Sequence, residues 1–178
     1  MGTTPIDPRP PQVAPDLTLP KLLVQQAARH GDRRVALREK EFGIWQSFTW
    51  EDYLRHVREF ALGLVSLGLA PGDKVAIVGD NRPEWVFAEL AALAAGGVPL
   101  GIYKDSTATE VGYVIDNSDA VVVVAEDQEQ VDKLLELREK IPKVRHIVFA
   151  DPKGMLGYRD PLLRSFGDVE ALGRTLGQ

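Results

Sequence analysis

Two polar loops of the sequence combine residue types and spacings that suit ligand chemistry. The first is segment 79–85, which reads Gly-Asp-Asn-Arg-Pro-Glu-Trp, and the second is segment 101–107, which reads Gly-Ile-Tyr-Lys-Asp-Ser-Thr. Each loop follows a short apolar run that is typical of a buried strand. Ligands on open α/β sheets bind beyond the carboxyl ends of the strands, so both loops are candidate binding edges. In the second loop, the ring of Tyr103 can stack on a planar ligand.

The same loops also have a structural interpretation as helix starts. Asn81 can cap a helix whose first turn holds Pro83, where the missing N–H group of proline costs no hydrogen bond. Thr107 and Glu110 have the spacing of a capping box. The acidic run 126–132 places negative charge in the first turn of a helix, where the helix dipole stabilises it. We favour this interpretation and keep ligand binding as the alternative for the first two loops.

Motifs for several other kinds of chemistry are missing from the sequence. It contains no G-x-x-x-x-G-K-[ST] phosphate loop, no G-x-G-x-x-G after an apolar run, no G-x-S-x-G nucleophile elbow and no cysteine. The three histidines, His30, His56 and His146, lack the spacing of a zinc site. We therefore predict no catalytic residue and no metal-binding residue in this chain.

Composition excludes several broad classes of protein. The 178 residues are 44% hydrophobic and 26% charged, which is ordinary for a globular domain. The formal charge of −5 leaves no basic excess for binding nucleic acid. The longest apolar stretches fall well short of the roughly 20 residues that cross a bilayer, and the start of the chain lacks the apolar core of a signal peptide. A cytoplasmic protein is expected, with peripheral association with a membrane surface left open.

The pattern of apolar residues predicts the elements that position the two loops. Residues 1–17 hold five prolines and are expected to form a disordered tail, followed by one α/β unit over 18–178. A helix from 18 to 31 and a hairpin of runs 35–38 and 44–48, with a loop longer than two residues, come first. Helices are then expected at 49–68, 81–95, from 107, 127–140 and 167–176, and strands at 74–78, 98–102, 120–125 and, as the last strand, 144–149.

Alternation of these strands with helices predicts the fold class. Near-continuous Val and Ile runs are typical of parallel strands that are covered on both faces. The fold class is therefore α/β, with a doubly wound, mostly parallel sheet and flanking helices, preceded by a helix and a β-hairpin.

Several segments, taken in order, resemble the amino-terminal region of AMP-forming long-chain acyl-CoA synthetases, which belong to the adenylate-forming superfamily. The resemblance covers about residues 18–176, and its order and spacing are more specific than any single motif. The segments that carry it are 48–50 (Phe-Thr-Trp), 67–69, 71–76, 81–85 (Asn-Arg-Pro-Glu-Trp), 96–103, 124–133, 151–154 and 165–166.

The resemblance implies a fatty acid–CoA ligase whose parent protein is much longer. In that family ATP and a fatty acid give an acyl-adenylate, and CoA then displaces AMP; Mg²⁺ assists. The phosphate loop, the acidic residue that serves magnesium and the lysine of the mobile carboxy-terminal domain have no counterpart here. The resemblance therefore implies part of the large N-terminal domain, truncated before the phosphate loop. Alone it should be inactive and bind none of these cofactors, and its partner would be the remainder of the same polypeptide.

The resemblance also suggests where a ligand would lie. Related enzymes place part of CoA against the loop that follows the strand ending near Ile102, so the cofactor-binding candidates are Gly101, Tyr103, Ser106 and Thr107. Lys104 either meets a CoA phosphate or remains solvated. Without the missing half of the domain, one face of the sheet should be uncovered and available for self-association.

Two other hypotheses remain open at the level of sequence. One is a self-contained doubly wound binding or receiver-like module, in which Asp80 and Asp105 near strand ends would form an acidic pocket. Magnesium binding would favour it. The other is a naturally short protein that pairs with itself or a partner through an uncovered apolar face.

Overall fold

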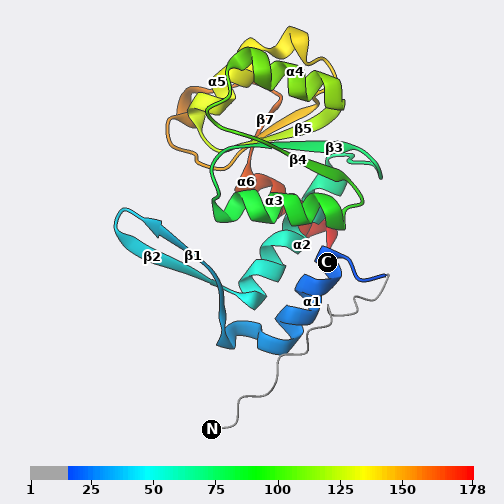
Figure 1. The fold of residues 1–178 in the computed structure, drawn as a ribbon, viewed down its shortest axis with the longest axis vertical. Coiled ribbons are helices and arrows are strands. Elements are labelled where there is room, and N and C mark those ends of the chain that lie inside the picture. Colours follow the sequence, from blue (N-terminus) through cyan, green and yellow to red (C-terminus); the bar gives the residue numbers. More distant parts are fainter. Residues whose placement is uncertain (1–15) are drawn as a thin grey trace, which may run out of the picture.

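A five-stranded parallel sheet forms the centre of this protein (Figure 1). The computed structural model describes residues 16–178, so the predicted tail at 1–17 lies almost wholly outside the described residues. The strands follow the order β4-β3-β5-β6-β7, in which the chain first steps outward from β3 to β4 and then continues on the other side of β3. They are β3 (Lys74–Val78), β4 (Val98–Ile102), β5 (Ala120–Ala125), β6 (His146–Phe149) and β7 (Leu163–Ser165).

Helices cover both faces of this sheet, as Figure 1 shows. One face packs against α4 (Ala108–Ser118) and α5 (Gln128–Glu136), and the other packs against α2 (Trp50–Ser66), α3 (Pro83–Ala94) and α6 (Phe166–Leu176). The alternation of strand residues explains this arrangement: Val75 and Ile77 enter one core, whereas Ala76 and Val78 enter the other. The predicted doubly wound α/β fold is confirmed, but the prediction of an uncovered sheet face is wrong, because the chain supplies helices for both sides.

The amino-terminal elements stand outside the sheet. Helix α1 (Leu19–His30) packs on α2, and the short 3₁₀ helix η1 (Gly31–Arg33) leads into the hairpin of β1 (Val35–Glu41) and β2 (Ile44–Thr49). The hairpin loop has two residues, Phe42 and Gly43, both with positive φ (46° and 82°), as in a type I′ turn. We predicted a longer loop, and this prediction is wrong. The sequence did not indicate the two-residue turn, because phenylalanine is unusual in this left-handed conformation.

Two further predictions need correction. Strand β7 extends the sheet beyond β6, which we predicted to be the last strand; its three residues and the preceding Pro161 give too little apolar pattern to reveal it. The N-cap of α3 is Arg82 rather than Asn81, and no side chain caps that helix. Beyond α5, a 3₁₀ turn η2 (Arg138–Lys140) replaces the last turn of the predicted helix, and a second, η3 (Met155–Gly157), follows β6.

Helices α2 and α6 cross at unusually close range because glycines face each other. A Cβ atom on Gly63 would lie 2.1 Å from the carbonyl oxygen of Val169, and one on Gly173 would lie 1.7 Å from the carbonyl oxygen of Glu59. Real Cβ atoms do not approach backbone this closely. The crossing therefore requires glycine at both positions.

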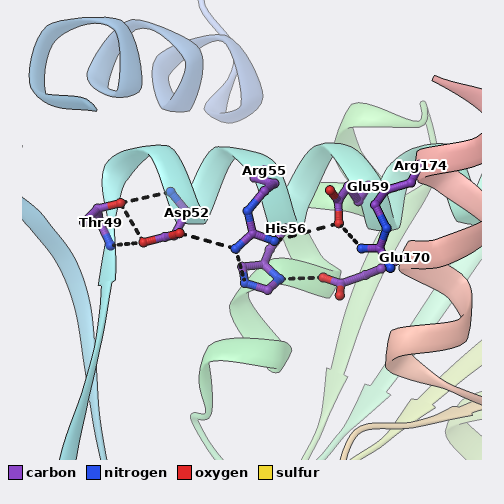
Figure 2. Close-up of polar contacts among 7 residues, drawn as sticks. All are labelled: Thr49, Asp52, Arg55, His56, Glu59, Glu170 and Arg174. Carbon is purple, nitrogen blue, oxygen red and sulfur yellow. Dashed lines mark hydrogen bonds and ion pairs between the residues drawn. The ribbon is translucent and has the colours of Figure 1, made fainter. Parts of the chain in front are cut away.

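A row of polar contacts runs beside this crossing (Figure 2). The Arg174 guanidinium lies 2.6 Å from Glu59, and His56 Nδ1 lies 2.5 Å from Glu170 Oε1. Arg55 can only donate, so its 3.1 Å contact makes His56 Nε2 an acceptor and leaves the proton on Nδ1, which donates to Glu170. The buried Glu170 carboxylate thus has a hydrogen-bond partner, as a buried charge needs.

His146 on β6 gives the first testable prediction. Burial, together with Arg164, lowers the pKa of its imidazole from 6.5. The unfolded chain then binds a proton before the folded one does, so the free energy of unfolding should fall as the pH drops below 6.5. Replacing His146 with glutamine should make this slope shallower in urea unfolding curves recorded from pH 7 to pH 5. His30, whose pKa is also lowered by burial, is left in place and retains part of the slope. An unchanged slope would contradict the assignment.

Candidate functional site

The two candidate loops lie side by side at the carboxyl edge of the sheet. Parallel pairing aligns β3 and β4 so that Val78 is opposite Ile102, and both strands end at the same level. The loops enclose a surface pocket of about 240 Å³, lined by Gly79, Asn81, Trp85, Gly101, Ile102 and Tyr103. The structure therefore brings together Gly101 and Tyr103 but does not place Ser106 or Thr107 on the pocket wall.

The shape of this pocket depends on the absence of a side chain at Gly101. A Cβ atom there would lie 2.9 Å from Cζ2 of the Trp85 indole, so the indole packs across the glycine backbone. The ring of Tyr103 is 88% exposed at the rim, where it can meet a planar ligand. Asn81 and Trp85 belong to the first candidate loop, but they were not among the cofactor-binding residues expected from the sequence.

A charged group borders the pocket on the side of β5. Lys104 forms an ion pair with the carboxylate of Asp80, and this hydrogen bond raises the pKa of the lysine. The backbone N–H group of Asp80 donates to Glu126 Oε2 at 2.7 Å. Gly79 permits this approach, because a Cβ atom at that position would lie 2.7 Å from the Cβ atom of Glu126. Lys104 therefore neutralises a neighbouring carboxylate instead of standing alone in solvent.

Arg82 connects the first loop to the hairpin. Its Nε atom lies 3.1 Å from Glu39 Oε1 and 3.6 Å from Glu84 Oε2, and Glu41 lies 3.9 Å from its Nη2 atom. Burial alone would lower the pKa of this guanidinium, but the surrounding carboxylates, with Glu39 first, outweigh burial and raise the pKa. Arg82 thus holds the hairpin against the body of the protein and does not face the pocket as an available cation.

The second loop continues directly into the N-terminus of α4. Thr107 Oγ1 accepts from the N–H group of Glu110 at 3.3 Å, and Glu110 Oε2 accepts from the N–H group of Thr107 at 2.8 Å. The predicted capping box is therefore confirmed. The N–H group of Ser106 donates to the carbonyl oxygen of Tyr103, which closes the turn. Contacts of Ser106 and Thr107 with a ligand remain a prediction.

The capping role of Thr107 can be tested by substitution. Thr107→Ala should lower the free energy of unfolding by about 1 kcal/mol, because the helix loses the acceptor for a backbone N–H group. Thr107→Ser should retain most of this stability. Thr109→Ala, two positions later on the exposed surface of the same helix, is the matched control and should have little effect. Urea unfolding followed by circular dichroism measures all three, and equal stability of the two alanine variants would contradict the capping role.

The pocket is lined by backbone and by amide, aliphatic and aromatic side chains. Within residues 16–178, no group of three or more histidine, aspartate or glutamate side chains gathers where it could hold a metal ion. Asp80 pairs with Lys104, and Asp105 does not line the pocket, so the two carboxylates do not form the acidic pocket of the receiver-like hypothesis. The described residues therefore do not offer a set of ligands that fits Mg²⁺.

Comparison with known proteins places these features in a wider group. A family model described as AMP-binding enzyme matches residues 23–164. Long-chain-fatty-acid–CoA ligase ACSBG2 of Xenopus laevis is 31% identical over 162 residues, which are 91% of this chain and 22% of the relative. Long-chain-fatty-acid–CoA ligase FadD15 of Mycobacterium tuberculosis is 36% identical over 106 residues, which are 60% of this chain and 18% of the relative. This chain thus spans about a fifth of the length of these relatives.

Solved structures show the same architecture. Acetoacetyl-CoA synthetase from Streptomyces lividans superposes with a TM-score of 0.76 at 25% identity, covering 85% of this chain and 24% of that chain. An anthranilate CoA ligase, AuaEII, solved with anthranoyl-AMP, superposes with a TM-score of 0.75 at 21% identity, covering 88% of this chain and 29% of that chain. The second likeness concerns the fold alone.

Proposed function

Since the chain belongs to the family of AMP-binding enzymes, we propose that it forms the amino-terminal part of an ATP-dependent long-chain fatty acid–CoA ligase. The observation that carries this proposal is its similarity, over 91% of its length, to a long-chain-fatty-acid–CoA ligase. The whole protein would form an acyl-adenylate from ATP and a fatty acid and then transfer the acyl group to CoA. This chain would supply structure and one ligand edge, while the remainder of the polypeptide would supply the reacting groups.

The ligand edge is the pocket between the loops after β3 and β4. We propose that it contacts CoA through the Tyr103 ring and the exposed backbone of Gly101. The open backbone beside Trp85 and the exposed ring of Tyr103 support this role. Lys104 contributes less to binding, because its charge is already paired with Asp80.

Activity can be tested in a chimera. The segment of Xenopus laevis ACSBG2 that matches this chain over 162 residues is replaced by the matching part of this chain, and fatty-acid-dependent formation of AMP and acyl-CoA is measured. Activity in the chimera, with none in ACSBG2 lacking the segment, is the expected result. A chimera that folds and still binds ATP but forms no acyl-adenylate from any fatty acid would contradict the ligase proposal.

Binding of CoA can be tested separately in the chimera. Tyr103→Ala should raise the KM for CoA, whereas Tyr113→Ala, which removes an exposed ring on α4, should leave it unchanged. Equal responses of the two variants would remove Tyr103 from the binding edge without affecting the ligase proposal.

A further inference from the structure

The tip of the β1–β2 hairpin carries three large apolar side chains that are mostly exposed. It projects from the body, at the left of Figure 1. Near its tip, Phe42 is 91% exposed, Ile44 66% and Trp45 60%. Exposed apolar groups gathered on a projecting element usually mark a contact surface.

The two faces of the hairpin differ in charge. In the strand register, Arg38 pairs with Ser47 and Lys40 with Trp45, so these residues share one face. Glu39 and Glu41 share the other face. We call the first set, Arg38, Lys40, Trp45 and Ser47, the cationic face; it contains no acidic side chain.

Arg82 fixes the direction of the cationic face. Its ion pairs with Glu39 and Glu41 hold the acidic face against the body, so the cationic face is turned away from it. On that outer face, the Lys40 ammonium lies 6.0 Å from the centre of the Trp45 ring, within cation–π range. Cations and an indole are thus presented together to the surroundings.

More positive charge lies at the base of the hairpin. Arg29, Arg33 and Arg34 are exposed there beside one acidic neighbour in the same turn, Asp32. Within residues 16–178 none of these arginines, nor Arg38 or Lys40, forms an ion pair. His30 lies among these arginines, and its pKa is lowered first by burial and then by the positive charges of Arg34, Arg29 and Arg33. This local excess contrasts with the chain's formal charge of −5, so the hairpin end of the molecule would be drawn toward anionic partners.

We propose that the cationic face and the hairpin tip dock on an anionic lipid bilayer. The hairpin would lie along the surface, with Arg38 and Lys40 at the lipid phosphates, Trp45 at the headgroup level and Phe42 in the acyl region. A nucleic acid would satisfy the cations but leave Phe42 in water. A second copy of the chain would bring the same positive charges into contact, and like charges repel. A bilayer satisfies both the charge and the apolar tip.

This mode of attachment needs no membrane-spanning segment. None of the helices in residues 16–178 has the length and apolar character to cross a bilayer. Insertion of one or two side chains together with a few cations gives reversible binding that weakens as salt screens the charges.

The variant Phe42→Asn isolates the role of the tip. Phe42 has φ +46°, and asparagine is among the residues best suited to that conformation before Gly43. The hairpin should therefore persist while the apolar ring is lost. Arg38→Gln with Lys40→Gln removes charge from the cationic face. The matched control is Leu156→Ser with Lys153→Gln, which removes an equally exposed apolar group and an exposed cation from the η3 region.

The experiment is co-sedimentation of this chain with vesicles of phosphatidylcholine alone or mixed with phosphatidylglycerol. We expect binding only to the mixed vesicles, weakened about tenfold by Phe42→Asn and about tenfold by the double charge variant, with the control unchanged. Lipids brominated in their acyl chains should quench Trp45 fluorescence, an effect lost in Trp45→Phe. The proposal would be overturned if the chain did not bind mixed vesicles, or if Phe42→Asn bound them as well as the unchanged chain does. It would also be overturned if Phe42→Asn changed self-association without lipid, because the tip would then belong to contacts between copies.

Discussion

Replacing Gly173 with alanine should destabilise the protein more than any other single methyl group added to its surface helices. The new Cβ atom would lie 1.7 Å from the carbonyl oxygen of Glu59 and 2.8 Å from the backbone nitrogen of Gly63. Both are backbone atoms of α2 and cannot turn aside as a side chain could, so α6 must move away from α2. We expect a loss of about 3 kcal/mol in the free energy of unfolding, at the upper end of ordinary overpacking.

Gly167 provides the matched control for this substitution. It lies in the same helix, and an added Cβ atom there would meet no other atom within 4 Å. Gly167→Ala should therefore be neutral or stabilising by up to about 1 kcal/mol, since alanine favours the helix more than glycine does. Urea unfolding followed by far-UV circular dichroism measures both variants. If Gly173→Ala were as stable as Gly167→Ala, the close crossing of α2 and α6 would be wrong.

Truncating Phe87 should produce the second large effect. Its ring is buried on α3 and packs against both α2 and β2. The ring centre lies 4.7 Å from that of His56 and 5.4 Å from that of Tyr53 on α2, and 5.6 Å from that of Phe48 on β2. Phe87→Ala removes these contacts and leaves a cavity, so we expect a loss of about 3–5 kcal/mol. Because Phe48 belongs to β2, the hairpin should also loosen from the body.

Phe42→Ala tests whether the loss of stability in Phe87→Ala is caused by the burial of the ring. It deletes the same ring at a position that is 91% exposed and leaves a Cβ atom at the same positive φ, so stability should change by less than about 0.5 kcal/mol. Thermal and urea unfolding give the free energies, and near-UV circular dichroism reports the loss of aromatic packing in Phe87→Ala. Similar losses in the two variants would mean that the aromatic cluster around Phe87 does not form.

The sequence by itself determined four of the five strands of the sheet and the class of the fold. Strands β3, β4 and β5 have the predicted bounds, because each is a near-continuous apolar run that ends at polar loop residues. The capping box at Thr107 was also correctly predicted, since the interacting groups lie three residues apart. These features depend on neighbours along the chain, which the sequence displays directly.

The candidate site was only partly predictable. Alternation of strands and helices located both loops at the carboxyl edge of the sheet and included Gly101 and Tyr103. It did not show that Trp85 packs across Gly101, or that Lys104 is paired with Asp80. Those contacts depend on the spacing and twist of adjacent strands.

Only the tertiary structure decided how distant segments meet. Gly63 and Gly173 matter because two helices cross there, His56 meets a carboxylate 114 residues further along the chain, and Arg82 turns one face of the hairpin inward. Strand β7 is likewise defined by its pairing with β6 rather than by its own three residues. Periodicity and capping act over a few residues, whereas these contacts follow from the packing of whole helices and strands, so no local pattern in the sequence encodes them.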